Sequence, residues 1–384
     1  MNPFNFGNIA VGRWFVDREK ELKRLKRSAT SGGKIMLISP RRYGKTSLAF
    51  KLKETLEKEK GAVVIYVDTM ACASLRQFVD KYTSALANAL ESTVEKAWKF
   101  LVEILPTLRP QVQMTSGPEG SEVSVQIVPQ GQDADNEKIF ESILDLPEKT
   151  AVKRKKPVVI ILDEFQAIRE FDPTKTRNAL LWKMRSKIQH HRHVGYVFAG
   201  SQKHLLEQMV EPHDSPFFKM LDVMKLEKID PILFSEFIRR RFKEGGLVAT
   251  EEVLTQILTQ AENVPFYVLN LSHELYEYVK DGRGKLDEAA VDSCVIGLAK
   301  KNHPQYESQW ERLSGLQKNA LKAIASGHKE SLFSIATLKK FEFGSVGGTQ
   351  KALKSLIEAQ HLHKVGASYC FDDIWFKEWI KWKR

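Results

Sequence analysis

Lys34-Ile35-Met36-Leu37-Ile38 runs directly into Ser39-Pro40-Arg41-Arg42-Tyr43-Gly44-Lys45-Thr46-Ser47, and this stretch decides the fold. Its first part is apolar at nearly every position, as in a strand buried on both faces of a parallel sheet, and a helix is expected from Thr46 onward. A tight loop between a strand and a helix aims backbone N–H groups at phosphate oxygens, and the helix N-terminus adds a partial positive charge. The stretch therefore predicts a phosphate-binding loop, with ATP as the expected ligand.

The end of this loop has three residues with separate expected roles. Gly44 lets the backbone approach the phosphates, Lys45 places its ammonium against the β- and γ-phosphates, and the Thr46 hydroxyl completes the ligand shell of a Mg²⁺ ion. Ser39 stands where the motif has its first glycine, and a small residue can serve there. We expect the nucleotide site to be lined by Ser39, Pro40, Arg41, Arg42, Tyr43, Gly44, Lys45, Thr46 and Ser47. Arg41 and Arg42 either contact phosphates or face solvent or a neighbouring carboxylate.

The sequence on either side of the loop alternates strand and helix patterns. Further apolar strand candidates are Ala62–Asp68, Pro157–Asp163 and His193–Gly200. Between the strand candidates lie the helical patterns Thr46–Lys58, Leu75–Phe100 and Asn178–His190. Strands that alternate with helices in this way predict a doubly wound α/β domain with a parallel sheet.

Two carboxylates follow one of these strands directly. Five apolar residues, Val158 to Leu162, end at Asp163-Glu164. The carboxyl end of a strand is where an open α/β sheet binds its ligands. We expect Asp163 to hold Mg²⁺ and Glu164 to polarise the water that attacks the γ-phosphorus. An ordinary strand end with two acids is the alternative, and the nearby phosphate loop argues against it.

A polar pair also follows the last strand candidate. Gly200 is succeeded by Ser201-Gln202, and Ser201 is the better candidate to sense the γ-phosphate or orient the attacking water. The alternative is a turn residue that caps the helix expected at Lys203–Gln208.

The rest of the chain reads as an insertion and two smaller regions. Residues 106–135 are rich in Pro, Gly, Ser and Gln, with a short strand-like alternation at Val123–Val128, and predict a surface insertion, most simply a loop without its own function. Residues 229–301 are helical in pattern. The C-terminal region predicts short helices at Leu316–Ala325, Leu332–Phe341 and Thr349–Ala359, and a hairpin of Leu362–Val365 with Ser368–Phe371.

Composition narrows the class of protein without choosing a partner. The 384 residues predict two or three domains, and the net charge of +11 suits a nucleotide, a nucleic acid or an acidic membrane surface. The three cysteines have no ligand spacing, which argues against a disulfide framework or a cysteine zinc site and suits a reducing cytoplasm. No signal segment and no run of about 18 apolar residues is present. We expect a soluble cytoplasmic protein with no membrane partner.

These residues together resemble the archaeal-type ATPase family, in the STAND branch of P-loop NTPases related to AAA+ proteins. Pro40–Leu48 is similar to the family's Pro-Arg-Arg-x-Gly-Lys-Thr-Ser-Leu form, Leu162–Gln166 to its acidic motif, and Gly200-Ser201 to its sensor. The resemblance covers nearly the whole chain. It implies a P-loop NTPase core at residues 1–228, with the insertion at 106–135, a helical lid at 229–305 and a winged helix at 306–384.

The resemblance also implies residues around the base of the nucleotide. Trp14–Leu22 looks like the segment that lines the adenine pocket in relatives, which brings in Phe15, Val16 and Arg18. Pro265 falls in the family's Gly-x-Pro position and is expected to pack on the base, although Asn263 replaces the glycine. Lys219 stands where relatives tend to carry an arginine, so Arg185 is our candidate for an arginine finger.

The C-terminal end is similar to the family's winged helix. Tyr369–Ile380 matches its final motif, with Ile374 at the usual proline. In a DNA-binding winged helix the third helix enters the major groove, and Lys351 and Lys354, with Lys339 and Lys340 nearby, are placed to meet phosphates. Residues 306–384 carry 13 Lys or Arg and 8 Asp or Glu, a net charge of +5, which is no basic stripe. Winged helices also serve as protein-contact modules.

Three functions are compatible with the sequence. The first is an ATPase switch, in which ATP binding and hydrolysis to ADP change the pose of the winged helix toward an unidentified protein or DNA partner. The second is a nucleotide-regulated DNA-binding protein, similar to replication initiators or transposition helper ATPases. The third is a non-catalytic protein-interaction regulator. Slow intrinsic hydrolysis and an oligomer fit the first, because an arginine finger is usually supplied by another subunit.

Overall fold

A computed structural model describes residues 2–90, 93–105, 109–117, 120–128, 136–172 and 178–383. The chain forms two compact units. The sheet unit contains Arg18–Ser39 and Gly44–Glu227. The helical unit contains the segment up to Asp17, the four residues Pro40–Tyr43, and the chain from Lys228 onward. The chain changes unit between Glu227 and Lys228, near the expected boundary at residue 228, and it also passes between the units at residue 17 and on both sides of Pro40–Tyr43.

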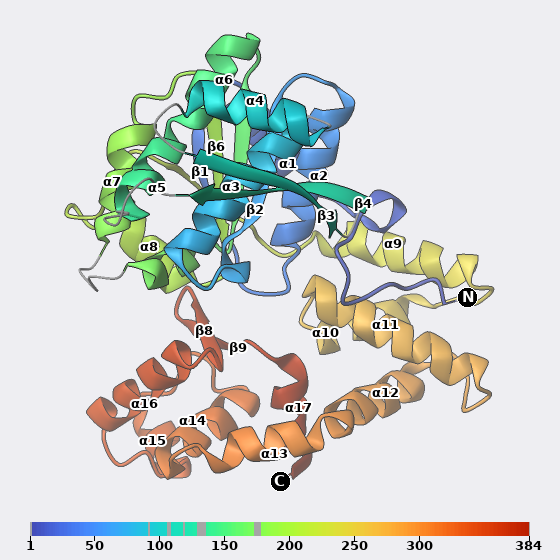
Figure 1. The fold of residues 1–384 in the computed structure, drawn as a ribbon. Helices are drawn as coiled ribbons and strands as arrows, with labels where there is room; N and C mark the ends of the chain where they lie inside the picture. The colour runs from blue at the N-terminus through green and yellow to red at the C-terminus, as the bar shows by residue number, and fades with distance from the viewer. Residues whose placement is uncertain are drawn as a thin grey trace. The chain divides into compact units, whose positions relative to one another are not determined.

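The sheet unit is built on five parallel strands (Figure 1). They are β1 (Lys34–Ile38), β2 (Val63–Asp68), β5 (Val158–Asp163), β6 (Val194–Gly200) and β7 (Asp222–Lys225). Their spatial order is β2-β5-β6-β1-β7, so β1 and β5 lie on either side of β6. Every residue of β5 and β6 is buried, which explains their continuous apolar sequence. The predicted parallel α/β fold is confirmed, and β7 is an additional edge strand.

Helices cover both faces of this sheet. They are α1 (Glu19–Thr30), α2 (Lys45–Lys58), α3 (Leu75–Leu90), α4 (Val94–Ile104), α5 (Asn136–Leu144), α6 (Leu146–Arg154), α7 (Ala179–Ile188) and α8 (Lys203–Val210), with short 3-10 turns at Gly12–Trp14, Thr69–Ala71 and Phe165–Phe171. Helix α1 crosses β6 so closely that a Cβ on Gly195 would lie 1.9 Å from the Ala29 carbonyl oxygen. Gly195 is therefore required for this helix to pack on the sheet.

The insertion contains a β-hairpin that belongs to the sheet unit. Strands β3 (Arg109–Gly117) and β4 (Gly120–Val128) pair antiparallel, and Figure 1 shows them beside α3. Val123, Val125 and Ile127 are buried in the core shared with α3. The strand-like alternation at Val123–Val128 is therefore a hairpin strand, part of β4, whereas the simpler expectation of a loop is wrong. Residues 106–108, 118–119 and 129–135 of the predicted insertion lie outside the described residues. The single helix expected at Leu75–Phe100 is two helices, and Thr93 caps the second.

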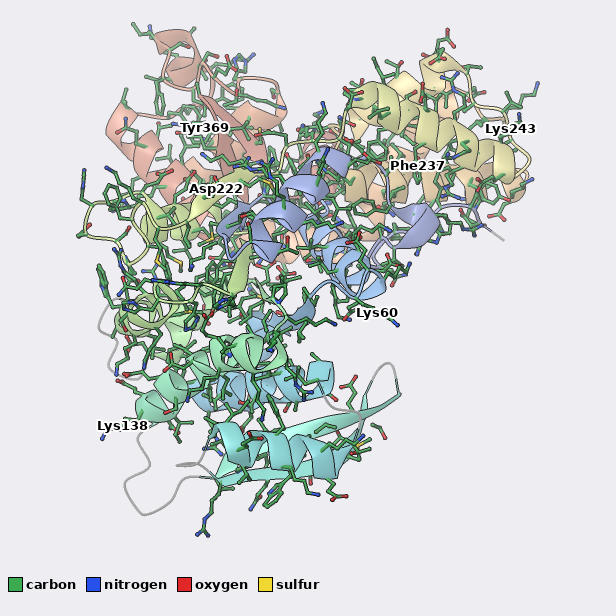
Figure 2. The ribbon with its side chains drawn as sticks, turned by 90° about the horizontal axis from the view of Figure 1, so that it is seen from above. Lys60, Lys138, Asp222, Phe237, Lys243 and Tyr369 are labelled. Carbon is green, nitrogen blue, oxygen red and sulfur yellow. The ribbon has the colours of Figure 1, made fainter. Side chains whose placement is uncertain are left out.

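Helices also make up most of the other unit. The expected lid, residues 229–305, contains α9 (Pro231–Glu244), α10 (Glu251–Gln260), α11 (Pro265–Lys280) and α12 (Glu288–Lys301), and α13 (His303–Glu311) spans its expected boundary with the winged helix. The winged helix contains α14 (Gly315–Ala325), α15 (Ile335–Lys340), α16 (Val346–Glu358), β8 (Leu362–Val365), β9 (Ser368–Phe371) and α17 (Ile374–Lys383). Figure 2 locates Phe237 and Lys243 on α9, where Phe237 is buried and Lys243 is exposed. One buried and one exposed side chain on the same helix are typical of an amphipathic helix with one face in the core.

The lid and the winged helix share one hydrophobic core. The last helix, α17, joins them through indole hydrogen bonds: Trp375 Nε1 donates to Asn270 Oδ1 at 2.8 Å and Trp379 Nε1 donates to His303 Nδ1 at 2.9 Å. Lys377 Nζ lies 2.7 Å from Glu262 Oε1 at the end of the lid. These buried polar contacts fix the register of α17, so the lid and winged helix form one unit.

Candidate active site

The phosphate loop lies between β1 and α2, as the sequence predicts. Gly44 has a φ of +88° and precedes the first residue of α2, Lys45. Only glycine adopts this conformation without strain, and the space around its absent Cβ is open. The N-cap residue of α2, Gly44, has no side chain that could cap the helix, so the first N–H groups can bind a phosphate.

Lys45 and Thr46 both reach Asp163 at the end of β5. Lys45 Nζ donates to Asp163 Oδ1, and Thr46 Oγ1 donates to Asp163 Oδ2 at 2.7 Å. Lys45 Nζ also lies 3.1 Å from Glu164 Oε1. Lys45 and Asp163 are buried, so each charge depends on the other for compensation. The structure therefore brings together the loop and the acidic strand end.

Glu164 is held toward this cluster by its backbone and by two further donors. Its φ is +47°, an uncommon conformation for a residue with a side chain. Ser201 Oγ, beyond the end of β6, donates to Glu164 Oε2 at 2.9 Å, and Gln166 Nε2 donates to the same oxygen at 2.6 Å. Such outliers occur at functional sites, where the surrounding contacts hold them in place. The structure therefore brings together Glu164 and Ser201, two residues that the sequence predicts for the site.

The charge on Glu164 is stabilised by these contacts. Burial raises the pKa of Glu164, but the Lys45 ammonium and the hydrogen bonds from Gln166 and Ser201 together lower it by more than burial raises it. The resulting pKa is below the ordinary value. Glu164 is therefore ionised at neutral pH. An ionised carboxylate can accept a proton from a water molecule.

Two residues of the site were not predicted as functional. Tyr66 on β2 donates its hydroxyl to Asp163 Oδ2 at 3.2 Å, because β2 pairs with β5 in register. Gln166 packs against Gly200, where a Cβ would lie 2.3 Å from its Oε1 atom. Gln166 falls in the acidic motif, which was a usable signal. Nothing in the sequence around Tyr66 indicates its partner.

The residues present fit a nucleotide and a magnesium ion. The buried Ser39 Oγ has no hydrogen-bond partner among the described residues, which suits a loop that binds a polar group. Thr46 Oγ1 and Asp163 Oδ2 are hard oxygen donors of the kind that Mg²⁺ prefers, and Mg²⁺ usually needs only one or two protein ligands. Thr46 and Asp163 would hold the ion.

The middle of the loop has other partners. Pro40–Tyr43 belongs to the helical unit, where Tyr43 is buried in the core. Arg42 Nη1 lies 3.5 Å from Asp373 Oδ2, and its guanidinium lies over the rings of Phe266 and Tyr267. Arg42 therefore matches the alternative that it meets a neighbouring carboxylate, and Arg41 is exposed. Ser47, in the first turn of α2, is half-buried.

The expected adenine-pocket residues are divided between the units. Three of them, Phe15, Val16 and Pro265, belong to the helical unit. Val16 is partly buried and packs against the core of that unit, and Pro265 is buried. Arg18 belongs to the sheet unit, is buried, and donates to the Glu227 carbonyl and to Glu21. A structural role therefore accounts for Arg18, and its contact with a base stays a prediction.

Arg185 has its described contacts away from the carboxylates. Its Nη1 atom donates to the Pro216 carbonyl, and its guanidinium lies over the Trp182 ring at 5.6 Å. The role of arginine finger stays a prediction. Within the described residues, no helix has the length and apolar character that crossing a membrane requires.

This combination of phosphate loop, acidic strand end and polar strand tip defines a P-loop ATPase. The sequence profile of the family described as "ATPase domain predominantly from Archaea" matches residues 15–271. The chain belongs to that family. A second profile, described as "Probable winged helix domain", matches residues 304–382. A search of curated proteins finds no sequence match.

Solved structures share this fold at low sequence identity. The Walker-type ATPase PABY2304 of Pyrococcus abyssi is 17% identical with a TM-score of 0.66, and the match covers 99% of each chain. The ORC2 protein of Aeropyrum pernix, solved as ADPNP–ADP complexes, is 14% identical with a TM-score of 0.52, again over 99% of each chain. These likenesses concern the fold alone, and they extend over nearly the whole of each chain.

Proposed function

We propose that this protein is an ATP-hydrolysing switch whose nucleotide state repositions the lid and winged helix relative to the sheet unit. The single observation that carries the switch is the division of the phosphate loop. Pro40–Tyr43 packs in the helical unit, whereas Ser39 and Gly44 onward belong to the sheet unit. Consecutive Cα atoms are about 3.8 Å apart, so four residues give the loop little slack. A change in loop geometry therefore displaces one unit against the other.

The site residues account for both binding and hydrolysis. Phosphate oxygens compete for the Lys45 ammonium that the two carboxylates share in the structure. Glu164 then accepts a proton from water as the water oxygen bonds to the γ-phosphorus. The bond from that phosphorus to the β–γ bridging oxygen breaks, and ADP and inorganic phosphate leave. Ser201 holds the Glu164 carboxylate in place throughout. A bound Mg²⁺ ion, held by Thr46 and Asp163, supplies positive charge against the phosphates.

The switch is tested by a distance measurement across the two units. Spin labels at Val152→Cys on α6 and Val365→Cys on β8 report the separation, since both side chains are exposed. Cys370 is replaced by serine, because it is half-buried while Cys72 and Cys294 are buried. We expect different distance distributions with ADP and with a non-hydrolysable ATP analogue plus Mg²⁺. Identical distributions in a protein that binds both nucleotides would exclude the switch.

The winged helix has two candidate partners, a protein and DNA. Lys339 and Lys340 on α15 and Lys351 and Lys354 on α16 are exposed, as phosphate contacts require. Ile335 and Val346, at the starts of the same helices, are 75% and 42% exposed, which suits a protein surface better. We therefore favour a protein partner.

Titration with labelled duplex DNA decides between the two partners. A DNA-binding protein shows affinity that falls steeply between two salt concentrations, and its affinity drops further in a Lys351→Gln, Lys354→Gln variant. Absence of binding even at low salt excludes DNA. The protein partner is then sought by affinity purification with the ATP analogue and with ADP.

A further inference from the structure

We propose that Arg42 is a positioning residue that ties the phosphate loop to the winged helix, and that the nucleotide state reaches α17 through this tie. The inference rests on the proposed function and deepens it. Arg42 is two residues before Gly44 and three before Lys45, so its backbone is part of the loop that holds the phosphates. Its side chain contacts the turn between β9 and α17.

Arg42 is fixed by both its backbone and its side chain. Its φ is +71°, an uncommon conformation outside glycine, and its carbonyl accepts a hydrogen bond from the Phe266 N–H at the start of α11. The guanidinium lies 5.1 Å from the Phe266 ring centroid and 4.9 Å from that of Tyr267. Stacking on two aromatic faces holds a cation in one orientation. The first residues of α11 therefore set the conformation of the loop.

The same guanidinium meets the first turn of the last helix. Arg42 Nη1 donates to the Asp372 carbonyl at 3.3 Å and lies 3.5 Å from Asp373 Oδ2. The other Asp373 oxygen, Oδ1, accepts from the N–H groups of Trp375 and Phe376 and so caps α17. One carboxylate thus bonds to the loop and to the helix start. Rotation of Arg42 away from this position removes the positive charge from the cap.

The start of α17 is itself joined to the lid. The Tyr267 hydroxyl donates to the Asp372 carbonyl at 2.9 Å, the same carbonyl that Arg42 contacts. Tyr267 and Trp375 pack edge to face with centroids 5.3 Å apart. Arg42, Tyr267 and Asp373 therefore form one cluster in which the loop, lid and winged helix meet. The side chains of Arg42 and Asp373 are 35% and 31% exposed, so the tie is weak enough to break and reform.

Two substitutions test the tie at side chains that contact each other rather than Asp163 and Glu164. Arg42→Gln removes the cation, and Asp373→Asn removes the charge while it keeps the oxygen that caps α17. Each is introduced into the chain labelled at Val152→Cys and Val365→Cys. Arg283→Gln is the matched control, because Arg283 makes an ion pair with Asp281 at 3.0 Å and lies 5.1 Å from the Tyr278 ring, in the turn after α11.

We expect the nucleotide-dependent change in label distance to fall to less than half of its wild-type size in Arg42→Gln and in Asp373→Asn. The double variant should be no worse than Arg42→Gln alone, because the two residues act as one pair. The Arg283→Gln control should retain the distance change in full. Affinity for a fluorescent ADP analogue is measured for every variant, so that all distances are compared at saturating nucleotide.

A full distance change in Arg42→Gln, in a protein whose wild type shows the change, would overturn the inference and leave the proposed switch intact. Additive losses in the double variant would also overturn it. No distance change in the wild type would instead refute the switch itself, so the two failures are distinguishable. Thermal unfolding of each variant, compared with the Arg283→Gln control, separates loss of coupling from loss of folding.

Discussion

Two clusters of buried and partly buried carboxylates and lysines use similar chemistry in different regions of the molecule. In the sheet unit, Asp163 and Glu164 share Lys45. In the helical unit, Glu262 lies 2.7 Å from Lys377 Nζ and 3.2 Å from Lys329 Nζ. Both clusters offset the cost of burying charge by pairing. An ion pair alone therefore does not distinguish a functional site from a structural one.

The difference lies in what surrounds each cluster. The Asp163–Glu164 cluster stands at the ends of parallel strands, accepts hydroxyl donors from Thr46, Tyr66 and Ser201, and adjoins Gly44, where the space around the absent Cβ is open. The Glu262 cluster joins the end of α10 to α17 and to Lys329 of the winged helix. In a cluster that adjoins an open loop, the lysine can leave the carboxylates and bind a phosphate instead. A cluster enclosed between packed helices holds them together.

Removal of the lysine from each cluster should separate binding from stability. Lys45→Ala is expected to weaken Mg-ATP binding by roughly 100-fold, because it removes a charge-assisted contact with the phosphates. The matched variant Lys377→Ala should change ATP affinity less than threefold while it lowers the melting temperature. Calorimetric titration and thermal unfolding measure both. Equal affinity in Lys45→Ala and wild type would remove the distinction between the clusters.

Glu262 should contribute to stability in a pH-dependent way. Burial raises the pKa of Glu262, but Lys377 and Lys329 together lower it by more than burial raises it. The resulting pKa is about 2, below the ordinary value of 4.5. A carboxyl whose pKa is depressed in the folded protein stabilises it above pH 4.5, and the contribution is lost as the pH falls toward 2. We expect Glu262→Gln to lower the free energy of unfolding by about 2 kcal/mol at pH 7.

Urea unfolding at pH 7, 5 and 3.5 measures this contribution. The gap between wild type and Glu262→Gln should be constant from pH 7 to 5 and narrower at pH 3.5. Glu251→Gln serves as the control, because Glu251 pairs with Arg239 at an exposed position and should change stability by less than about 0.5 kcal/mol. A gap that widens at low pH would contradict the assignment.

Ser201 should affect turnover more than binding. Ser201→Ala removes the hydroxyl that donates to Glu164 Oε2, so the carboxylate loses one of its positioning contacts. The expected loss in kcat is about tenfold, in line with one hydrogen bond to a charged group. Steady-state phosphate release against ATP concentration gives kcat and KM separately. A rise in KM at unchanged kcat would place Ser201 in substrate binding instead.

Tyr66 should give the smallest effect. Burial and the Asp163 charge both raise the pKa of its hydroxyl, so it remains a donor to Asp163 across the working pH range. Tyr66→Phe keeps the ring, which packs on Phe50 at 4.6 Å, and removes only the donor. We expect about a threefold increase in the Mg²⁺ concentration for half-maximal hydrolysis. An unchanged Mg²⁺ requirement would assign Tyr66 to packing alone.

Local motifs explain why much of the sheet and site could be predicted. The strands β1, β2, β5 and β6 are continuous apolar runs, and the observed bounds differ from the expected ones by one residue at an end. The edge strand β7 was missed because Asp222 and Lys225 are exposed and only Met224 is buried, so it lacks such a run. The break between α3 and α4 was missed because the helix-forming pattern continues through it.

Long-range contacts explain the rest. Tyr66 reaches Asp163 only because β2 lies beside β5, and a single sequence does not reveal which strands are neighbours. Arg42 stands within a phosphate-binding motif, yet its side chain contacts Asp373, more than 300 residues further along the chain. Motif spacing therefore identifies the chemical groups, while tertiary packing decides their partners.

In the function we propose, Glu164 activates water for ATP hydrolysis at the Lys45–Thr46–Asp163 site. Phosphate release in a single turnover, measured beside equilibrium binding of ATP, tests it in wild type and Glu164→Gln. We predict that the variant binds ATP within threefold of wild type and releases phosphate at least about 100-fold more slowly. Phosphate release at the wild-type rate in Glu164→Gln would exclude this role of Glu164, and no release from a wild-type protein with ATP bound would exclude ATP hydrolysis at this site.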